Sequence, residues 1–316
     1  MYRFLFMCAI SFAGVAWAQS YPAKPLRFIV GFAPGGAPDT MTRLFADRLP
    51  ATLGQPIVVE NRPAAGGLVA ADNVSKALPD GYTLLSTATA SFIPALVKNV
   101  PYDPINDFAG IAPLANIHAA VVIGPSTNFN SLKEFIAFAK ANPGKLTFGS
   151  SGIGTPVHMS SEQFRHAAGF EALHVPQKGA AQSIIEVVAG RLDFYNSPVV
   201  AALPMIKAGK LSALAVLSRS RVALLPNVPT MGEAGLPEGV FQSGVGMWAP
   251  IKTSQEIVQR LNGEITRVAQ SAEVRDRLHS QGAEPWLSNP AQFDEFVRAY
   301  GARQAALIKA LGIKPE

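Results

Sequence analysis

Apolar residues along this chain follow two patterns that alternate. Short β-branched runs at 26–32 and 57–60 are typical of buried strands, whereas the segment between them has the spacing of a helix that begins near Pro38. Gly54 and Pro56 are expected to end that helix, because neither residue favours its continuation. The apolar positions with helical spacing are Met41, Leu44, Phe45, Leu49 and Leu53. This alternation of strand and helix patterns predicts an α/β architecture.

The alternation continues to the C-terminus. Further strands are expected near 82–87, 108–113, 119–123, 146–149, 172–175, 192–195, 213–217, 244–248 and 284–286. A capping box at Ser131 predicts one helix start, a second cap is expected at 253–256, and a long final helix is expected at about 290–311. A segment rich in Pro and Gly, 225–239, interrupts the pattern.

The order of these elements predicts two domains, the first of them discontinuous. The middle of the chain has enough elements for its own core, whereas the part that follows is too small for one. We therefore expect domain 1 to comprise residues 19–120 and 245–316, and domain 2 to comprise residues 121–244. The chain would cross between them near 119–124 and 244–249, which would form a hinge.

The first eighteen residues resemble a secretory signal peptide. One basic residue, Arg3, precedes an apolar stretch at 4–16, and Ala16-Trp17-Ala18 is a small-x-small ending. We expect cleavage before Gln19 and residence in the periplasm. A membrane anchor is the alternative, but the apolar stretch is shorter than the roughly 20 residues that span a bilayer.

Composition excludes several classes of function. The single cysteine, Cys8, lies inside the expected signal, so the mature chain has no thiol for catalysis, disulfides or thiolate metal sites. Without Arg3 there are 26 basic residues against 22 acidic ones, spread without a basic run, which argues against nucleic-acid binding. We expect no cofactor.

Two glycine-rich loops are the main candidates for binding chemistry. The segments at 32–41 and 148–159 each follow an apolar strand, cross a glycine turn and enter a helix with proline in its first turn. Such corners direct backbone N–H groups and the positive end of a helix dipole at an anion. The expected backbone donors are Gly35, Gly36, Ser151, Gly152 and Gly154. Ordinary turn formation is the alternative reading.

Polar side chains near these loops could complete a binding cleft between the domains. The candidates are Ser86, Thr87, Thr89, Ser150, Thr155, His158, Lys178 and Asn196. Each has an alternative role: Thr155 as an N-cap, His158 in helix packing, Lys178 on the surface and Asn196 in a turn. Asp39 falls in a helix first turn, where a structural role fits better than contact with an anion.

Catalytic and nucleotide-binding motifs are not found. The run 149–152 misses the G-x-S-x-G register, the histidines show no metal-binding spacing, and neither glycine loop contains a complete dinucleotide or P-loop motif. The pattern thus favours a binding protein over an enzyme.

Several motifs resemble one protein family. They are P-G-G-x-x-D at 34–39, E-N-R-P-x-A-G-G at 60–67, P-D-G-Y-T-L-L at 79–85, Y-D-P at 102–104, G-S-S-G-x-G-[ST]-P-x-H at 149–158 and V-P-T-x-x-E-x-G at 228–235. In this order they resemble the extracytoplasmic solute receptors of tripartite tricarboxylate transporters, the Bug family. The resemblance covers essentially the whole mature chain.

The resemblance implies a two-lobed periplasmic-binding-protein fold, type II-like, that closes over one ligand as a Venus flytrap. It implies a non-catalytic receptor that delivers a small di-, tri- or aromatic carboxylate to membrane permease subunits. In the family both glycine loops hold a ligand carboxylate, partly through ordered waters, which carries over to residues 32–36, including Phe32 and Ala33, and to residues 150–155. We expect a monomer.

Two departures from the family pattern bear on the ligand. Gln177 stands where the family commonly has tyrosine, and Asn196 stands where it commonly has aspartate. A neutral amide cannot pair with an amino group as a carboxylate does, so we expect a di- or aromatic carboxylate in preference to an amino acid. A sensing partner of a signalling receptor, or a periplasmic enzyme acting on an organic acid, are the competing functions.

Overall fold

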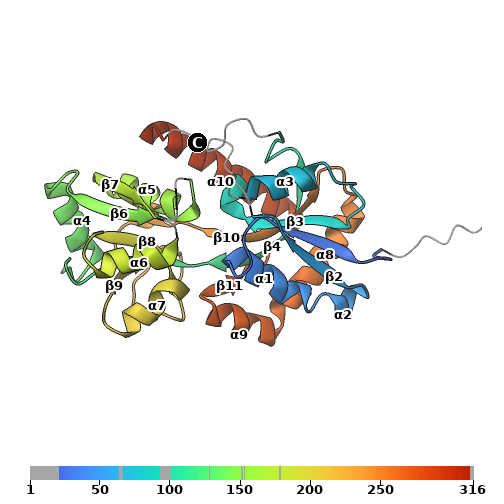
Figure 1. Cartoon of the computed structure of the whole chain (residues 1–316), viewed down its shortest axis with the longest axis horizontal. Helices are drawn as coiled ribbons and strands as arrows, with labels where there is room; N and C mark the ends of the chain where they lie inside the picture. Colours follow the sequence, from blue (N-terminus) through green and yellow to red (C-terminus); the bar gives the residue numbers. More distant parts are fainter. Residues whose placement is uncertain are drawn as a thin grey trace, which may run out of the picture.

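A computed structural model describes residues 21–63, 67–92, 101–127, 129–150, 152, 154–177 and 179–313. Within them the chain forms two α/β lobes, each built on one sheet (Figure 1). The expected signal peptide, Ser151 and Lys178 lie outside the described residues.

The first lobe contains a six-stranded mixed sheet. Its strands, in spatial order, are β11 (Ala283–Pro285), β4 (Phe108–Ile117), β10 (Ser243–Pro250), β3 (Thr83–Ala88), β1 (Leu26–Val30) and β2 (Ile57–Asn61). β1 pairs in parallel with β2 and β3, whereas β10 pairs antiparallel with both β3 and β4. Its helices are α1 (Ala37–Ala46), α2 (Pro50–Leu53), α3 (Leu68–Ser75), α8 (Gln255–Gln270) and α9 (Ala272–Ser280), with the 3-10 turn η2 (Thr89–Phe92) after β3.

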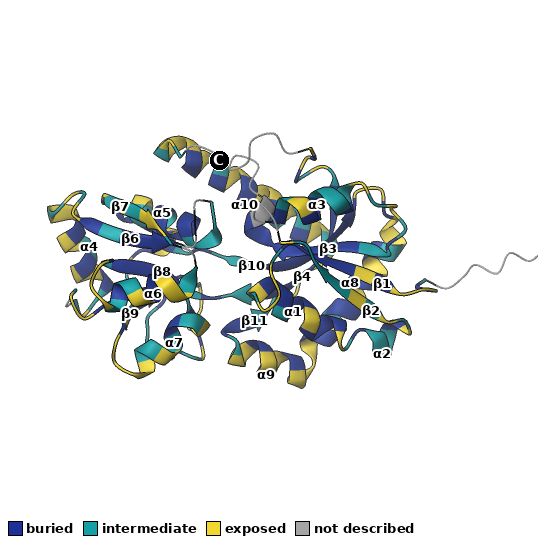
Figure 2. Ribbon diagram, in the orientation of Figure 1, coloured by how far each residue is buried: buried dark blue, intermediate teal, exposed yellow. Residues whose placement is uncertain are grey.

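The second lobe contains a five-stranded mixed sheet. Its order is β7 (Ala172–Pro176), β6 (Leu146–Ser150), β8 (Phe194–Pro198), β5 (Ala119–Ile123) and β9 (Ser212–Val216). Its helices are α4 (Leu132–Ala141), α5 (Pro156–Ala168), α6 (Ala180–Val188) and α7 (Val199–Lys207), with the 3-10 turn η4 (Pro237–Gly239). The central strands are buried and the outer faces of the helices are exposed (Figure 2), as expected for sheets covered by amphipathic helices.

The expected helix after the first loop is two helices in the structure. α1 ends at Ala46 and α2 begins at Pro50, because proline has no N–H to continue the helical hydrogen bonds. The expected end at Gly54 is confirmed: this residue has φ 70° and its N–H donates to the Pro50 carbonyl.

Helix starts agree closely with the sequence patterns. The Ser131 side chain caps α4 as expected, whereas Ser254, rather than Thr253, caps α8. The final helix, α10, spans Pro290–Leu311 and begins with a reciprocal capping box between Asn289 and Gln292.

Among the described residues, three parts of the chain connect the lobes. The chain leaves the first sheet after Ile117, passes through His118 and enters β5, and it returns to the first sheet at Ser243. α10 is the third connection (Figure 1). Its N-terminal half packs in the first lobe through Phe293 and Val297, and its C-terminal half packs in the core of the second lobe.

Candidate functional site

Both glycine loops lie where a central parallel strand ends and a helix begins. The first joins β1 to α1, and the second joins β6 to α5. The carboxyl ends of β1 and β6 point toward the interface between the lobes (Figure 1). In open α/β sheets ligands bind beyond the carboxyl ends of strands, so these loops define a candidate site between the lobes.

The first loop is held by a buried carboxylate. Gly35 has φ 81° and donates its N–H to Asp39 Oδ2 at 2.8 Å. The other carboxylate oxygen accepts from Asn61 Nδ2 at 2.7 Å and from Arg43 Nε at 3.0 Å. Asp39 is only 2% exposed. Its structural role, expected from the sequence, is therefore confirmed.

The charge of Asp39 is maintained by these partners. Burial alone would raise the pKa of its carboxyl group, but hydrogen bonds from Arg43, Gly35 and Asn61 outweigh burial and hold the pKa below its ordinary value. The carboxylate consequently occupies the positive end of the α1 dipole, a position otherwise open to an external anion.

The second loop is held by side chains at both ends. Gly152 has φ 121° and donates its N–H to Ser150 Oγ at 3.0 Å. Gly154 has φ 76° and donates to His158 Nδ1 at 3.1 Å. Thr155 is the N-cap of α5: its hydroxyl oxygen accepts from the His158 N–H at 3.3 Å, and its hydroxyl donates to the Gly152 carbonyl at 2.8 Å.

These contacts correct one expectation. The sequence predicted that Gly35, Gly36, Gly152 and Gly154 present free N–H groups, but each of these groups has an acceptor in its own loop or in the helix that follows. Gly36 donates to the Ala33 carbonyl at 3.2 Å. Buried or constrained amides rarely remain without a partner, and local acceptors have satisfied them. These hydrogen bonds therefore hold the shape of the two loops.

The expected side chains from β3 and η2 are packed rather than open. Ser86 is buried and its hydroxyl lies 2.6 Å from that of Thr42, while Thr89 is buried and its hydroxyl oxygen accepts from the Gly244 N–H at 3.3 Å. Thr87 is buried as well. In the first loop Phe32 is half-buried and Ala33 is exposed.

Asn196 is the most unusual polar residue of the candidate site. Its side chain is fully buried, and neither its amide nitrogen nor its oxygen has a hydrogen-bond partner. β6 and β8 pair in parallel with Phe148 opposite Phe194. Because side chains alternate along strands, Ser150 and Asn196, each two residues further on, lie on the same face of the sheet, Ser150 as the last residue of β6 and Asn196 in the middle of β8. Asn196 thus lies beside the second loop.

His174 belongs to the same region, although sequence reasoning did not select it. Its Nε2 atom lies 2.6 Å from Ser150 Oγ. A polar residue in the short apolar strand at 172–175 was the available signal, but only the parallel pairing of β6 with β7, which sets Phe148 opposite His174, brings the ring to the loop.

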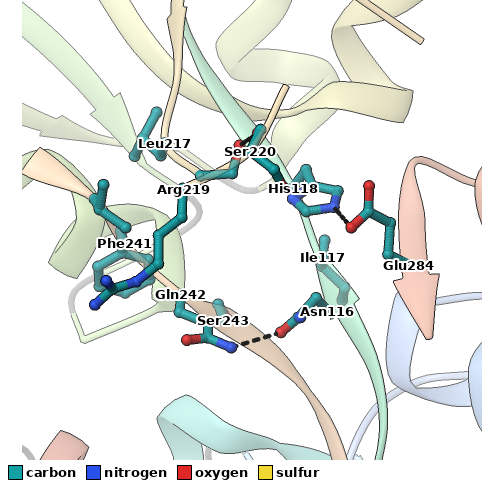
Figure 3. A pocket seen from close by; sticks show the side chains of 12 residues that line it. Asn116, Ile117, His118, Leu217, Arg219, Ser220, Phe241, Gln242, Ser243 and Glu284 are labelled. Carbon is teal, nitrogen blue, oxygen red and sulfur yellow. Dashed lines mark hydrogen bonds and ion pairs between the residues drawn. The ribbon is translucent and has the colours of Figure 1, made fainter. Parts of the chain in front are cut away.

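A separate cavity of about 140 Å³ lies at the connection between the lobes (Figure 3). Asn116 and Gln242, from the two connecting segments, are joined by a 3.1 Å hydrogen bond at its edge. His118 Nε2 lies 3.3 Å from Glu284 Oε2, and burial lowers the pKa of His118 while Glu284 opposes that shift. None of the site residues predicted from the sequence lines this cavity.

Two further features bear on function. Within the described parts of the chain, no helix is long and apolar enough to cross a bilayer. Nor do these residues include a group of three or more His, Cys, Asp or Glu side chains placed to hold a metal ion.

The two-lobed fold is that of periplasmic binding proteins, and comparisons identify the family. The profile described as "Tripartite tricarboxylate transporter family receptor" matches residues 41–313. Protein BugT of Bordetella pertussis is 34% identical over 315 residues, covering 98% of this chain and 96% of that protein. The chain belongs to the tripartite tricarboxylate transporter receptor family.

Solved structures give the same result. The R. palustris protein Rpa4515, solved with adipate, has a TM-score of 0.80 and 32% identity, covering 94% of this chain and all of that one. MatC from Rhodopseudomonas palustris, with bound malate, has a TM-score of 0.76 and 29% identity, covering 91% and 100%. The two-lobed fold implied by the sequence motifs is confirmed.

Proposed function

We propose that this periplasmic receptor captures a small dicarboxylate between its lobes and delivers it to the membrane subunits of a tripartite transporter. The observation that carries the proposal is the buried amide of Asn196, which has no partner and lies beside the second glycine loop. A buried polar group without a hydrogen bond costs about 1–3 kcal/mol. A ligand that pairs with this amide on binding recovers that free energy.

Dicarboxylates fit this site better than amino acids. The similar receptors solved with adipate and malate carry dicarboxylic acids. The amide of Asn196 can donate to a carboxylate oxygen, whereas it has no charge to offset an ammonium group. A dicarboxylate therefore gains a donor where an α-amino acid would leave a desolvated cation.

The two glycine loops supply the remaining contacts. One ligand carboxylate is held between residues 32–36 of the first lobe and residues 150–155 of the second, with Ser151 and Lys178 among the contributors. Hydrogen bonds to a charged group contribute about 1.5–3 kcal/mol each. Three or four of them, less the cost of ordering the ligand, support roughly micromolar affinity.

The domain organisation suits capture by closure. In this proposal the first domain comprises residues 19–120 and 245–316, with the C-terminal half of α10 packed on the second lobe, and the second domain comprises residues 121–244. Rotation about the connecting segments then brings the loops together. The protein binds without catalysis and acts as a monomer, after export by the cleaved segment 1–18.

A thermal-shift screen tests the proposal. The mature protein is heated with mono-, di- and tricarboxylates and with α-amino acids. A ligand that binds only the folded state raises the melting temperature by mass action. We expect adipate or malate to stabilise the protein and neutral alcohols of equal length to have no effect. Stabilisation by α-amino acids with no response to any dicarboxylate contradicts the proposal.

A further inference from the structure

Two histidines stack face to face behind the second glycine loop. The rings of His158, from α5, and His174, from β7, have centroids 4.1 Å apart with 24° between their planes. The ring of Phe148 stacks on His174 at 4.9 Å. The stack fixes both imidazoles in position, because neither ring can rotate without losing contact with its neighbour.

His174 reaches the loop through Ser150. Its Nε2 atom lies 2.6 Å from Ser150 Oγ, and that oxygen accepts the Gly152 N–H at 3.0 Å. Ser150 has no exposed surface. Its hydroxyl is thus fixed between the imidazole and the glycine, and the direction of the Gly152 peptide depends on it.

His158 holds the next glycine of the loop directly. Its Nδ1 atom accepts the Gly154 N–H at 3.1 Å. A neutral imidazole that accepts at Nδ1 carries its proton at Nε2, and here Nε2 faces Glu162 Oε1 at 3.5 Å. Glu162 is in turn paired with Arg165. His158 is 3% exposed, so its orientation is set by packing as well.

We propose that the stacked pair of His158 and His174 positions the ligand-binding loop, with His174 acting through Ser150 on Gly152 and His158 acting on Gly154. The inference rests on the proposed function, because it assigns Ser150, Gly152 and Gly154 to the ligand-binding loop. Neither histidine contacts the ligand in this scheme. Their effect is to preset the two peptide groups, which lowers the cost of ordering the loop on binding.

Burial keeps the His174 ring uncharged near neutral pH. Burial, followed by the proximity of His158, lowers the pKa of His174 to about 4, with Glu162 opposing the shift and Arg165 adding to it. From β6 the neighbours are uncharged: Phe148 stacks on the ring and Ser150 bonds it. A pKa of about 4 makes the His174 ring neutral at pH 7.

Matched variants separate hydrogen bonding from packing. His174→Phe keeps the stacked ring and removes the nitrogen that bonds Ser150, whereas His174→Gln loses the ring and retains a polar group at similar reach. Ser150→Ala removes the other end of the same contact. His158→Phe keeps a ring and removes the nitrogen that accepts from Gly154. If this variant does not fold, the other three carry the test, since His174 is only partly buried.

The first readout is hydrogen exchange at the amides of Gly152 and Gly154 without ligand. We expect faster exchange at Gly152 in His174→Phe and in Ser150→Ala, and near-normal exchange in His174→Gln. Unchanged exchange in both His174→Phe and Ser150→Ala overturns the proposal. This readout needs no ligand, so it stands even if the wild-type protein binds no carboxylate and the proposed function fails.

The second readout is the dissociation constant for adipate and for malate. We expect binding to weaken about tenfold in His174→Phe, the effect of losing about one hydrogen bond, and to recover largely in His174→Gln. The double variant Ser150→Ala/His174→Phe should bind as weakly as either single variant, because both remove one contact. Additive losses, or a His174→Phe variant with wild-type affinity and only a lower melting temperature, would show a purely structural role.

Discussion

Gly35 and Asp39 are related in the same way as Gly154 and His158 in the other lobe. In both pairs a glycine with positive φ, directly before the N-cap, donates its N–H to the side chain four residues later, at the third position of the helix. The two glycine loops, with the helix starts that follow them, thus share one backbone arrangement. They differ in the charge of the acceptor, which is a carboxylate in the first lobe and an imidazole in the second.

Removal of the Asp39 carboxylate tests whether this side chain holds the first glycine loop. Asp39→Ala leaves the Gly35 amide and the Asn61 amide without their acceptor, so the free energy of unfolding at pH 7 should fall by about 2–3 kcal/mol. Denaturant unfolding measures the change. Asp276→Ala, at an exposed position of α9, is the control and should cost less than about 0.5 kcal/mol.

The destabilisation caused by Asp39→Ala should depend on pH in one direction. The pKa of Asp39 is lower in the folded protein than in the unfolded chain, so its charge stabilises the fold above the unfolded pKa and this contribution is lost as pH falls through the folded pKa. The difference between Asp39→Ala and the wild type should shrink in acid. A difference that grows toward low pH would contradict the assigned role.

Gly152→Val tests the second loop. Gly152 has φ 121°, which a β-branched residue adopts only with strain, while the space around its Cβ position is open, with Thr155 Cγ2 at 3.7 Å. We expect the peptide to rotate, carboxylate binding to be abolished and the protein to remain folded. Gly144→Val imposes similar strain at φ 70° in a turn distant from the loops, so it should retain binding. Calorimetry and circular dichroism compare the two.

Asn196→Leu should change stability and binding in opposite directions. Replacing the unpartnered, buried amide by an apolar side chain of similar size removes a desolvation cost, so the unliganded protein should become more stable by about 1–2 kcal/mol. Dicarboxylate binding should weaken because the ligand loses its amide partner. Denaturant unfolding and calorimetric titration of the same sample measure both effects. A variant that loses stability yet binds normally would show that Asn196 is not part of the site.

His174 makes folding sensitive to mild acid. Its pKa of about 4 in the folded protein is below the ordinary value of 6.5, so protons bind preferentially to the unfolded chain. Stability from this group is complete above pH 6.5 and declines as pH falls toward 4. Because the side chain is partly exposed, we expect a loss of only about 1–2 kcal/mol over this range. His174→Gln should show a flatter pH profile than the wild type.

Much of this architecture was predictable from sequence, since it follows from local patterns. The apolar spacing of 290–311 and the signal at Ser131 gave helix starts and ends that the structure confirms. The break before Pro50 was missed because Leu49 and Leu53 keep a helical spacing across it. Periodicity reports which face is apolar and is insensitive to a short interruption.

The partners of the loop amides were not predictable in this way. Capture of Gly35 by Asp39 depends on the rotamer of a side chain, and the contact of Ser150 with His174 joins residues 24 positions apart through a parallel strand pair. The absence of partners at Asn196 is likewise a property of the packed core. The sequence thus located the two glycine loops, but it did not reveal the hydrogen-bond partners of their N–H groups.

Calorimetric titration of the mature protein with adipate and malate, alongside aspartate and glutamate, tests the central claim most directly. We predict binding of one dicarboxylate per protein with a dissociation constant of roughly micromolar order, and its loss in Gly152→Val. Saturable binding of an α-amino acid with no heat from either dicarboxylate, or full affinity in Gly152→Val, would contradict it.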